Sequence, residues 1–434
     1  MSQKLKQLLF LLCLVPVAAR AQEALSLDSA IAKALQYNYD IRIADISNQQ
    51  SVANNTLGNS GFLPSVNGTA GGTTASNNTY LQYTDGTTVN RTGALNYGYS
   101  AGLNITWTVF AAGRAYLVKK QLTALQRVTE AQLKAQVQAT VSQVIQAYAL
   151  TVYNQQQITA LDTSIELARA RMELSQAKFE IGTSAKVDYL QGRVDFNASR
   201  SQLLTQNASF EQARASLNAL MGEDEERTYA VADSLILNLT LEPTDKQQLR
   251  TANPTLAAAR FNADVSKLDA KIARTYYYPS LGVNGGYAYN YTHSQAGQFN
   301  FNRGFGPTGG ATLNIPIYQA GNIRRQVKVA SLQALSDELA YARQNTQLGR
   351  DYRTAWSAYQ NAVDAYKLEE ESISYARENL DIQKARFRVG IATSIELREA
   401  ENSYVQALAR KNNAAYNVKV NETRVLELES RLAQ

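Results

Sequence analysis

The chain has 434 residues, of which 43 are basic and 37 acidic, so its formal net charge is +6. Its only histidine is His293, in a Gly/Asn-rich stretch, and its only cysteine is Cys13. This composition argues against histidine- or thiol-dependent catalysis, disulfide bonds and cysteine metal sites. The sequence also has no phosphate-binding loop and no cluster of metal-ligand residues, so we expect no enzyme, no cofactor and no metal site.

The first 21 residues predict a cleaved secretory signal peptide. Lys4 and Lys6 form a basic start, Leu8 to Val17 an apolar core, and Ala19-Arg20-Ala21 a cleavage site. The alternative, a membrane anchor, is disfavoured because the apolar run is too short to span a bilayer. Cleavage removes Cys13 together with three basic residues and lowers the net charge to +3, so nucleic acid is not an indicated partner.

The first elements of the mature chain are a helix and a strand. The helix is expected from Asp28 to about Leu57, with Ser26 or Asp28 as its cap. The strand begins near Pro64, and a loop rich in Gly, Asn, Thr and Ser is expected from Thr73 to Leu95.

A second strand then runs into a very long helix. From Leu103, Leu, Ile, Trp and Val alternate with Asn and Thr, which is typical of a strand between two different environments. From Ala111 to Phe179 there is no Pro, Gly occurs only at Gly113, and apolar residues recur at three- and four-residue steps. This pattern predicts a helix of roughly 100 Å, which ends before Gly182.

The remaining elements follow the same order again. A return helix is expected to run to Leu220, and an acidic and then apolar connector spans Gly222 to Pro243, with short strands or turns. In the second series, a helix is expected at about Lys246–Thr275, a strand from near Pro279 and a polar loop at Thr292–Gly306. A second strand then enters a long helix that breaks at Gly390, and a return helix runs to Leu428.

The chain is therefore an internal duplication. At an offset of 208 residues, Val109-Phe110-Ala111-Ala112-Gly113 matches Ile317-Tyr318-Gln319-Ala320-Gly321, and Gly182 matches Gly390. Before the second strand the offset is 215, and the difference falls in a loop that tolerates it. We divide the chain into a signal peptide (1–21), a first repeat (22–222), a connector (223–244) and a second repeat (245–434).

Tyrosines are concentrated beside the expected strands. Such rings suit the boundary between lipid and water, although a soluble β-hairpin with aromatic cross-strand pairs would show them too. After the signal peptide no run of eighteen apolar residues exists, so any membrane segment must consist of strands. Four strands cannot close a barrel; two chains would give a filled one, and three chains would give twelve strands around a lumen. If the protein is a conducting channel, it must therefore be a trimer, because only the twelve-stranded barrel has a lumen.

Two further patterns concern the helices. Basic residues after the strands could hold lipid phosphates at the inner membrane surface, or could form an ordinary solvated turn; they are Arg114, Lys119, Lys120, Arg324, Arg325 and Lys328. The long helices carry Gln, Ser, Thr and Ala outside one apolar stripe, as expected of a coiled-coil wall. A filamentous or adhesive coiled coil would show the same surface, but the strands between the copies argue against it.

The signal peptide, the duplication, the strand pairs and the F-x-x-G turns in FEIGTSAKVDYL and FRVGIATSIELR resemble the TolC family of outer membrane efflux proteins over the whole mature chain. The resemblance implies a mixed α and β membrane protein. Four β-strands per chain would contribute to a twelve-stranded trimeric barrel, above a long α-helical coiled-coil tunnel through the periplasm of a Gram-negative bacterium.

The same resemblance implies a passive homotrimeric outer-membrane channel for efflux or secretion. It would be embedded in outer-membrane lipid and would dock with a periplasmic adaptor and an inner-membrane pump. The alternative is a periplasmic coiled-coil scaffold or adaptor protein without a pore. Adaptors carry one helical hairpin per chain, β-rich domains and an inner-membrane anchor, none of which the sequence indicates.

The resemblance also assigns roles to residues around the two glycine turns. The adaptor-docking tips would be Ile181, Gly182, Thr183, Ser184, Val389, Gly390, Ile391 and Ala392. The pore constriction would be Glu396, Glu399 and, in the first copy, Asp188; the alternative for these is the ordinary acidic start of a helix. Known members place a Tyr and an Arg where this chain has Phe387 and Ala392, so the contact that closes the tip must be built differently.

Overall fold

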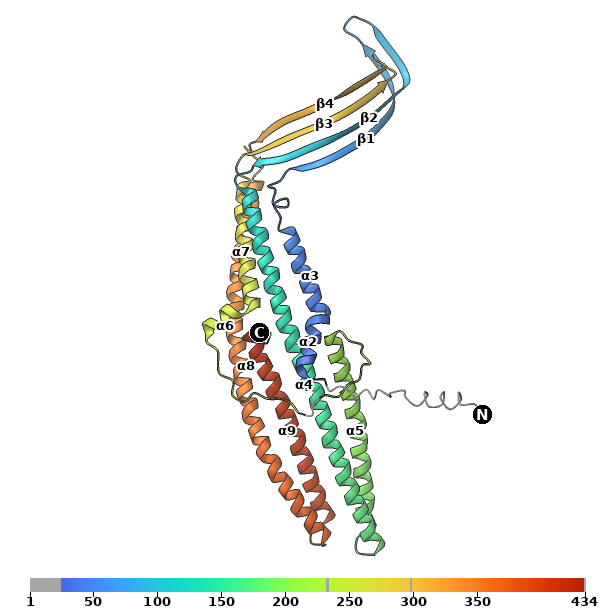
Figure 1. The fold of residues 1–434 in the computed structure, drawn as a ribbon, viewed down its shortest axis with the longest axis vertical. Helices are drawn as coiled ribbons and strands as arrows, with labels where there is room; N and C mark the ends of the chain where they lie inside the picture. Colours follow the sequence, from blue (N-terminus) through green and yellow to red (C-terminus); the bar gives the residue numbers. More distant parts are fainter. Residues whose placement is uncertain (1–24, 232–233, 297–298, 433–434) are drawn as a thin grey trace, which may run out of the picture. The chain divides into compact units, whose positions relative to one another are not determined.

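A computed structural model describes residues 25–231, 234–296 and 299–432 (Figure 1). The predicted signal peptide lies outside the described residues. The described chain forms two compact units, each drawn from both repeats. We call them the helical unit (the described parts of Met1–Ile43, Lys134–Asn253 and Gln347–Gln434) and the sheet unit (Ala44–Leu133 and Pro254–Thr346).

The sheet unit contains one antiparallel sheet of four strands in the order β1-β2-β3-β4, so β1 and β4 are its edges. The strands are β1 (Ser65–Gln82), β2 (Thr88–Phe110), β3 (Ser280–Ser294) and β4 (Phe301–Asn314). The expectation of four strands per chain is confirmed. The expected loops were too long, because most of their Gly, Asn, Thr and Ser residues belong to the strands. Their backbone groups pair across the ladder, as Thr73 does with Gly98, and this pairing outweighs their weak strand propensity.

The two faces of the sheet differ in polarity. Direct cross-strand partners share a face, so Leu103 shares one with Tyr287 and Trp107 with Val283. Aromatic rings stack on this face, with the centroids of Tyr99 and Tyr291 4.5 Å apart. The other face carries Asn and Thr side chains, in agreement with the alternation in the sequence. We call these the apolar face and the polar face.

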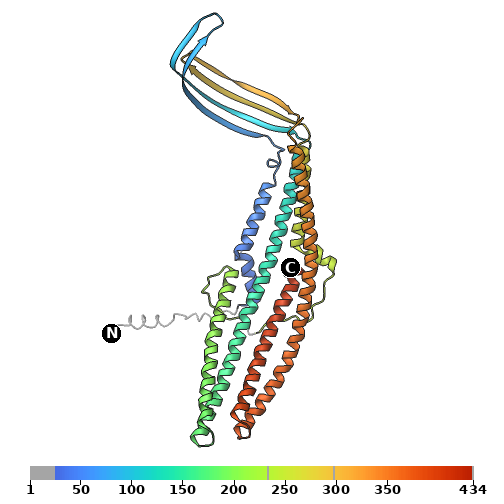
Figure 2. The same cartoon turned by 180° about the vertical axis from the view of Figure 1, so that it is seen from behind.

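The helices are α2 (Leu27–Tyr37), α3 (Tyr39–Asn54), α4 (Arg114–Glu180), α5 (Lys186–Met221), α6 (Lys246–Ala252), α7 (Pro254–Thr275), α8 (Asn322–Arg388) and α9 (Ser394–Leu428). The long helices α4 and α8 and the return helices α5 and α9 agree with the sequence prediction. Within the helical unit, α5 lies along α4 and α9 along α8 (Figures 1 and 2). Among the described residues, no helix combines the length and apolar character needed to cross a bilayer.

The prediction of one continuous first helix in each repeat was wrong. The break falls at Asn38 in the first repeat and at the matching Asn253 in the second. The Asn38 side-chain oxygen accepts hydrogen bonds from the backbone N–H groups of Asp40 and Ile41, at 2.9 and 3.2 Å, and so starts α3 anew. Asn253 precedes Pro254, which disfavours helical backbone at Asn253 and is itself well suited to the first position of α7.

Each asparagine at these breaks also binds the end of a return helix. Asn38 Nδ2 donates to the carbonyl of Leu220 at 2.9 Å, and Asn253 Nδ2 donates to that of Leu428 at 3.2 Å. A buried core in the helical unit lies beside the first of these contacts. It joins α2, α4 and α5 and includes Ala30, Val144, Val152, Leu217 and Met221.

Candidate functional site

The two helical hairpins of the helical unit, α4–α5 and α8–α9, end in glycine turns. Gly182 has φ +77° and Gly390 has φ +83°, a conformation that glycine adopts without steric cost. The turns close alike: the N–H of Thr183 donates to the carbonyl of Lys178 at 2.8 Å, and that of Ile391 to Arg386 at 2.9 Å. The sequence therefore located both ends of the hairpins correctly.

The turns expose apolar side chains to solvent. Ile181, Val389 and Ile391 are all exposed, and so are Gly182, Thr183 and Gly390, whereas Ser184 is half-buried. Ala392 differs because it is buried in a cluster formed mainly by α8 and α9. Exposed apolar residues at two hairpin ends are typical of a surface that binds another protein.

The second turn is followed by the two acidic residues that the resemblance singles out. Glu396 belongs to a capping box with Thr393: its Oε2 accepts from the Thr393 backbone N–H at 2.6 Å and from the Thr393 hydroxyl at 2.9 Å. These bonds lower the pKa of Glu396, so its carboxylate stays ionised. Glu399 is exposed one turn further along α9, on the same side of the helix.

Asp188 occupies the corresponding position in the first hairpin. It lies in the first turn of α5, and its Oδ2 accepts a hydrogen bond from the Ser184 hydroxyl at 2.7 Å. Glu396 and Asp188 thus each bond to a residue just before their own helix, which fits the alternative that the sequence left open for them, an ordinary acidic helix start. This role explains why the two acidic residues stand where they do, and their negative charges remain close to the hairpin turns.

The side chains of Phe387 and Ala392 pack among apolar residues. Phe387 is buried with Leu380, Leu397 and Ala400. Its ring also lies under Lys178 of the other hairpin, whose Nζ is 3.9 Å from the ring centroid. The same Nζ donates to the Phe387 carbonyl at 2.8 Å. One ammonium group therefore joins the first hairpin to the second close to both turns.

A second connection between the hairpins is a buried charge cluster. Arg171 of α4 donates through Nε to Glu401 of α9 at 2.8 Å and through Nη1 to Asp195 of α5 at 2.9 Å. The side chains of Arg171 and Glu401 are only 4% and 7% exposed. Burial raises the pKa of Glu401, while the charge of Arg171 and its hydrogen bond act in the opposite direction. We call this group the hairpin cluster.

Sequence reasoning missed the hairpin cluster and Lys178, although one signal was present. Arg171 stands in the buried stripe of α4 that also contains Ile165, Ala168 and Ser175. A charged residue in such a stripe is rarely buried without a partner, so its position indicates an ion pair. The partner could not be identified, because Glu401 is 230 residues away along the chain.

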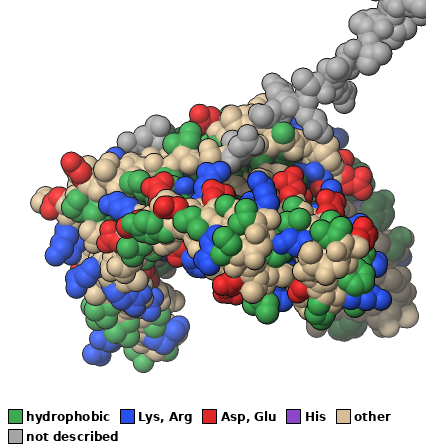
Figure 3. Space-filling view, turned by 90° about the horizontal axis from the view of Figure 1, so that it is seen from below, with side chains coloured by type: hydrophobic (Ala, Val, Ile, Leu, Met, Phe, Trp, Pro, Cys, Tyr) green, Lys and Arg blue, Asp and Glu red, His purple; other side chains and the backbone are tan. Residues whose placement is uncertain are grey.

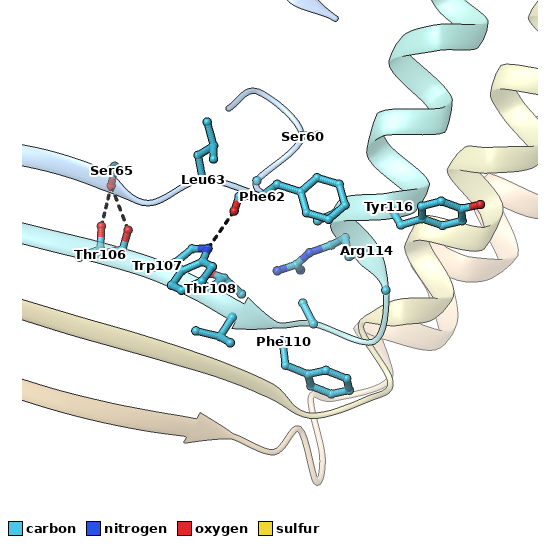
Figure 4. A pocket seen from close by; sticks show the side chains of 15 residues that line it. Ser60, Phe62, Leu63, Ser65, Thr106, Trp107, Thr108, Phe110, Arg114 and Tyr116 are labelled. Carbon is cyan, nitrogen blue, oxygen red and sulfur yellow. Dashed lines mark hydrogen bonds between the residues drawn. The ribbon is translucent and has the colours of Figure 1, made fainter. Parts of the chain in front are cut away.

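The predicted membrane anchors lie in the sheet unit and differ in their contacts. Arg114 borders an open cavity of about 570 Å³ between the start of β1 and the end of β2, where the Trp107 indole donates to the Phe62 carbonyl at 3.0 Å (Figure 4). Lys120 lies over the Tyr116 ring. Lys119 is engaged within the chain, since its Nζ donates to the Asn55 carbonyl at 2.7 Å. The second-repeat residues Arg324, Arg325 and Lys328 are exposed.

Seen from below, hydrophobic side chains are interspersed with both basic and acidic ones (Figure 3). Across the described ranges, no group of three His, Cys, Asp or Glu side chains is arranged to hold a metal ion.

Known proteins share both the sequence pattern and the fold. The family model described as outer membrane efflux protein matches residues 30–223 and 246–428. The outer membrane protein TolC of Vibrio cholerae is 22% identical over 330 residues, which cover 73% of this chain and 73% of that protein. The cation efflux system protein CusC of Escherichia coli is 21% identical over 401 residues, 90% of this chain and 83% of CusC.

Solved structures agree with this result. The outer-membrane channel OprN superposes with a TM-score of 0.79 at 18% identity, covering 93% of this chain and 89% of OprN. The CmeC outer membrane channel of Campylobacter jejuni gives 0.78 at 19% identity, with 93% and 85% covered. The family match favours a channel over the alternative of a scaffold or adaptor without a pore. The chain belongs to the outer membrane efflux protein family, whose members are homotrimeric channels of the Gram-negative outer membrane that extend into the periplasm and dock with an adaptor and an inner-membrane pump.

Proposed function

We propose that three copies of this chain form a passive exit duct whose periplasmic end is narrowed by Glu396 and Glu399, with Asp188 nearby. The observation that supports this most is the placement of two acidic side chains three residues apart, immediately after the turn of the second hairpin. Threefold symmetry multiplies them to six carboxylates around the axis. Acidic rings of this kind attract cations in channels.

The capping box is compatible with this ring. Glu396 uses Oε2 to bind Thr393, and the same bonds lower its pKa, so the residue keeps its negative charge in the periplasm. Glu399 adds a charge that no helix cap requires. Glu396 therefore serves both the helix cap and the acidic ring, whereas Glu399 contributes only its charge.

The exposed turns would dock the adaptor. Ile181, Val389 and Ile391 form small apolar projections at the ends of two hairpins that Lys178 and the hairpin cluster hold together. An adaptor that separates the hairpins must break the Lys178–Phe387 contact and the Arg171–Glu401 pair. These contacts would take the place of those that known members make through a Tyr and an Arg of the second tip, which bond across to the first tip.

The exposed basic residues of the sheet unit would bind lipid phosphates at the inner membrane surface. Arg324, Arg325 and Lys328 are free to reach a headgroup, and Arg114 and Lys120 contribute from the first repeat. Lys119 has a different task here, because its ammonium group already binds Asn55.

Single-channel recordings in planar bilayers test the acidic ring. Glu396→Gln and Glu399→Gln each remove a charge, and Gln at 396 can still complete the capping box. We expect weaker cation preference in each variant and a further loss in the double variant. Glu371→Gln, which removes an exposed charge from α8 far along the chain from the turn, is the matched control and should leave selectivity unchanged. Wild-type selectivity in the double variant would exclude the ring.

A further inference from the structure

Both edges of the four-stranded sheet are unpaired in the single chain. β1 and β4 each use one side of their backbone for β2 and β3, and the other side faces outward. In a bilayer the exposed N–H and C=O groups of an open edge are too costly, so each edge needs a partner strand. In a ring of identical chains, β4 of one copy pairs with β1 of the next. The homotrimeric assembly of the family implies such a ring, but it does not say which residues of β4 and β1 lie opposite each other.

The duplication extends to the register of the strands. In the first repeat Ser65 lies opposite Thr106, and in the second repeat the matching residues, Ser280 and Asn314, are also opposite each other. The next pairs agree as well, with Val66 opposite Ile105 and Leu281 opposite Leu313. The hairpins β1–β2 and β3–β4 are thus equivalent residue by residue, with offsets of 215 for the first strand and 208 for the second.

The β2–β3 ladder therefore serves as a template. It joins the last strand of one repeat to the first strand of the next, and the contact between two chains joins the same kinds of strand. Within the chain, Thr106 lies opposite Asn284 and Ile105 opposite Gly285. Applying the two offsets, we propose that β4 pairs with β1 of a second copy so that Asn314 lies opposite Thr69 and Leu313 opposite Ala70 of that copy.

The two faces of the sheet support this register independently. Leu313 is on the apolar face, because it is two residues from Ala311, the partner of Val283. Ala70 is on the same face, because it lies opposite Ala101, two residues before Leu103. Asn314 and Thr69 meet on the polar face. A slip of one residue would join the apolar face to the polar one, so only registers displaced by two residues compete.

The segment after β4 provides a third observation. Ile317 and Tyr318 are 92% and 84% exposed, whereas the matching Val109 and Phe110 are 47% and 52% exposed. Phe110 lies opposite Leu281 in the template, so Tyr318 comes to lie opposite Val66 of the second copy. Val66 follows Ser65, which lines the cavity of Figure 4 together with Phe62 and Leu63. The second copy thus covers two of the most exposed apolar residues of the sheet unit.

Pro316 fits the same arrangement. It matches Thr108, where the β2–β3 ladder shifts its register before Phe110. A proline has no N–H to donate and is tolerated at such an irregularity or at an edge. The proposed ladder between chains is therefore regular up to Asn314 and irregular beyond it, as β4 itself is within the chain.

Disulfide trapping tests the register, and the chain has no cysteine after Cys13 to interfere. The variant Thr69→Cys/Asn314→Cys is compared with two controls displaced by two residues, Asn67→Cys/Asn314→Cys and Gly71→Cys/Asn314→Cys. Directly opposite residues have Cα atoms about 4.5–5.5 Å apart, within disulfide range, whereas diagonal neighbours are about 7–8 Å apart and outside it. After oxidation of outer membranes, we expect covalent dimers and trimers in non-reducing gels to be at least tenfold more abundant for the Thr69 pair.

The second pair, Leu313→Cys/Ala70→Cys, repeats the test on the apolar face. More cross-linking in a displaced control, or equal cross-linking in all variants, would overturn the proposed register. The inference rests on the proposed function, in which copies assemble through their sheets. Gels of reduced, unheated samples test that assembly separately, because they show the trimer without any disulfide bond. A heat-sensitive trimer without any cross-link in either designed pair would refute the register while leaving the duct intact. Monomers in every sample, wild type included, would refute the duct and the pairing together.

Discussion

The hairpin cluster allows a direct test of what holds the two hairpins together. Arg171→Met keeps much of the side-chain volume and removes the charge that Glu401 and Asp195 share. Glu401 then remains buried without a cationic partner in contact. Removing one member of a buried ion pair costs about 3–5 kcal/mol, because the remaining charge is left uncompensated. Loss of the ion pair between Arg171 and Asp195 adds less to this cost, since the Asp195 side chain is partly exposed.

The loss should depend on pH in a defined direction. Burial already raises the folded-state pKa of Glu401 above its ordinary value of 4.5, and removing Arg171 takes away the largest opposing influence. A carboxyl group with a raised folded-state pKa is destabilising when ionised, so the penalty is full above that pKa and fades as the pH falls toward 4.5. Arg171→Met should therefore be much less stable than wild type at pH 8 and closer to it at pH 5.

The measurement is thermal loss of helix content, followed by circular dichroism in detergent at the two pH values. For a unit of this size, a loss of about 3 kcal/mol lowers the apparent midpoint by roughly 6–12 °C. Arg171→Met/Glu401→Met should recover most of it, because it replaces both buried charges with apolar side chains. Arg410→Met is the matched control: its partner Glu369 is in an exposed pair, so about 1 kcal/mol or less is expected.

Two results would contradict this reasoning. If Arg171→Met behaved like Arg410→Met, the cluster would contribute no more than a surface pair. If its midpoint fell equally at both pH values, an ionised Glu401 could not be the source of the loss.

The secondary structure was largely predictable because each period in the sequence has a single physical cause. Alternation from Leu103 reflects the two faces of β2, and the apolar stripe after Ala111 reflects the buried side of α4. The polar ends of the strands were predicted as loops. Their Gly, Thr and Asn residues show no alternation of apolar and polar side chains, because both faces of the sheet are exposed there. The breaks at Asn38 and Asn253 were missed for another reason. The asparagines matched between the repeats, but their hydrogen bonds to α5 and α9 exist only in the folded chain.

The candidate site was predictable only in part. Glycine turns are local, so Gly182 and Gly390 could be placed from the sequence, and the acidic residues were located with them. The contacts that join the hairpins are not local: Lys178 meets Phe387 and Arg171 meets Glu401 across more than 200 residues. A sequence shows that a charge lies in a buried stripe, but the fold determines which carboxylate it meets.

Single substitutions test the docking turns and the C-terminal end of the return helix α5. Ile391→Asp places a charge on an exposed turn, so it should weaken adaptor binding at least tenfold in a pull-down assay while the trimer and its melting temperature stay unchanged. Loss of the trimer would show that Ile391 is structural. Gly222→Ala should be strongly destabilising, because Gly222 has φ +68° and an added Cβ would lie 2.7 Å from the Tyr37 carbonyl oxygen. Gly182 has a similar φ, +77°, but open space around it, so Gly182→Ala costs only the backbone strain of about 1–2 kcal/mol. The difference between the two variants in thermal melting isolates the close approach of α2 to the end of α5, and equal losses would mean that Tyr37 moves aside freely.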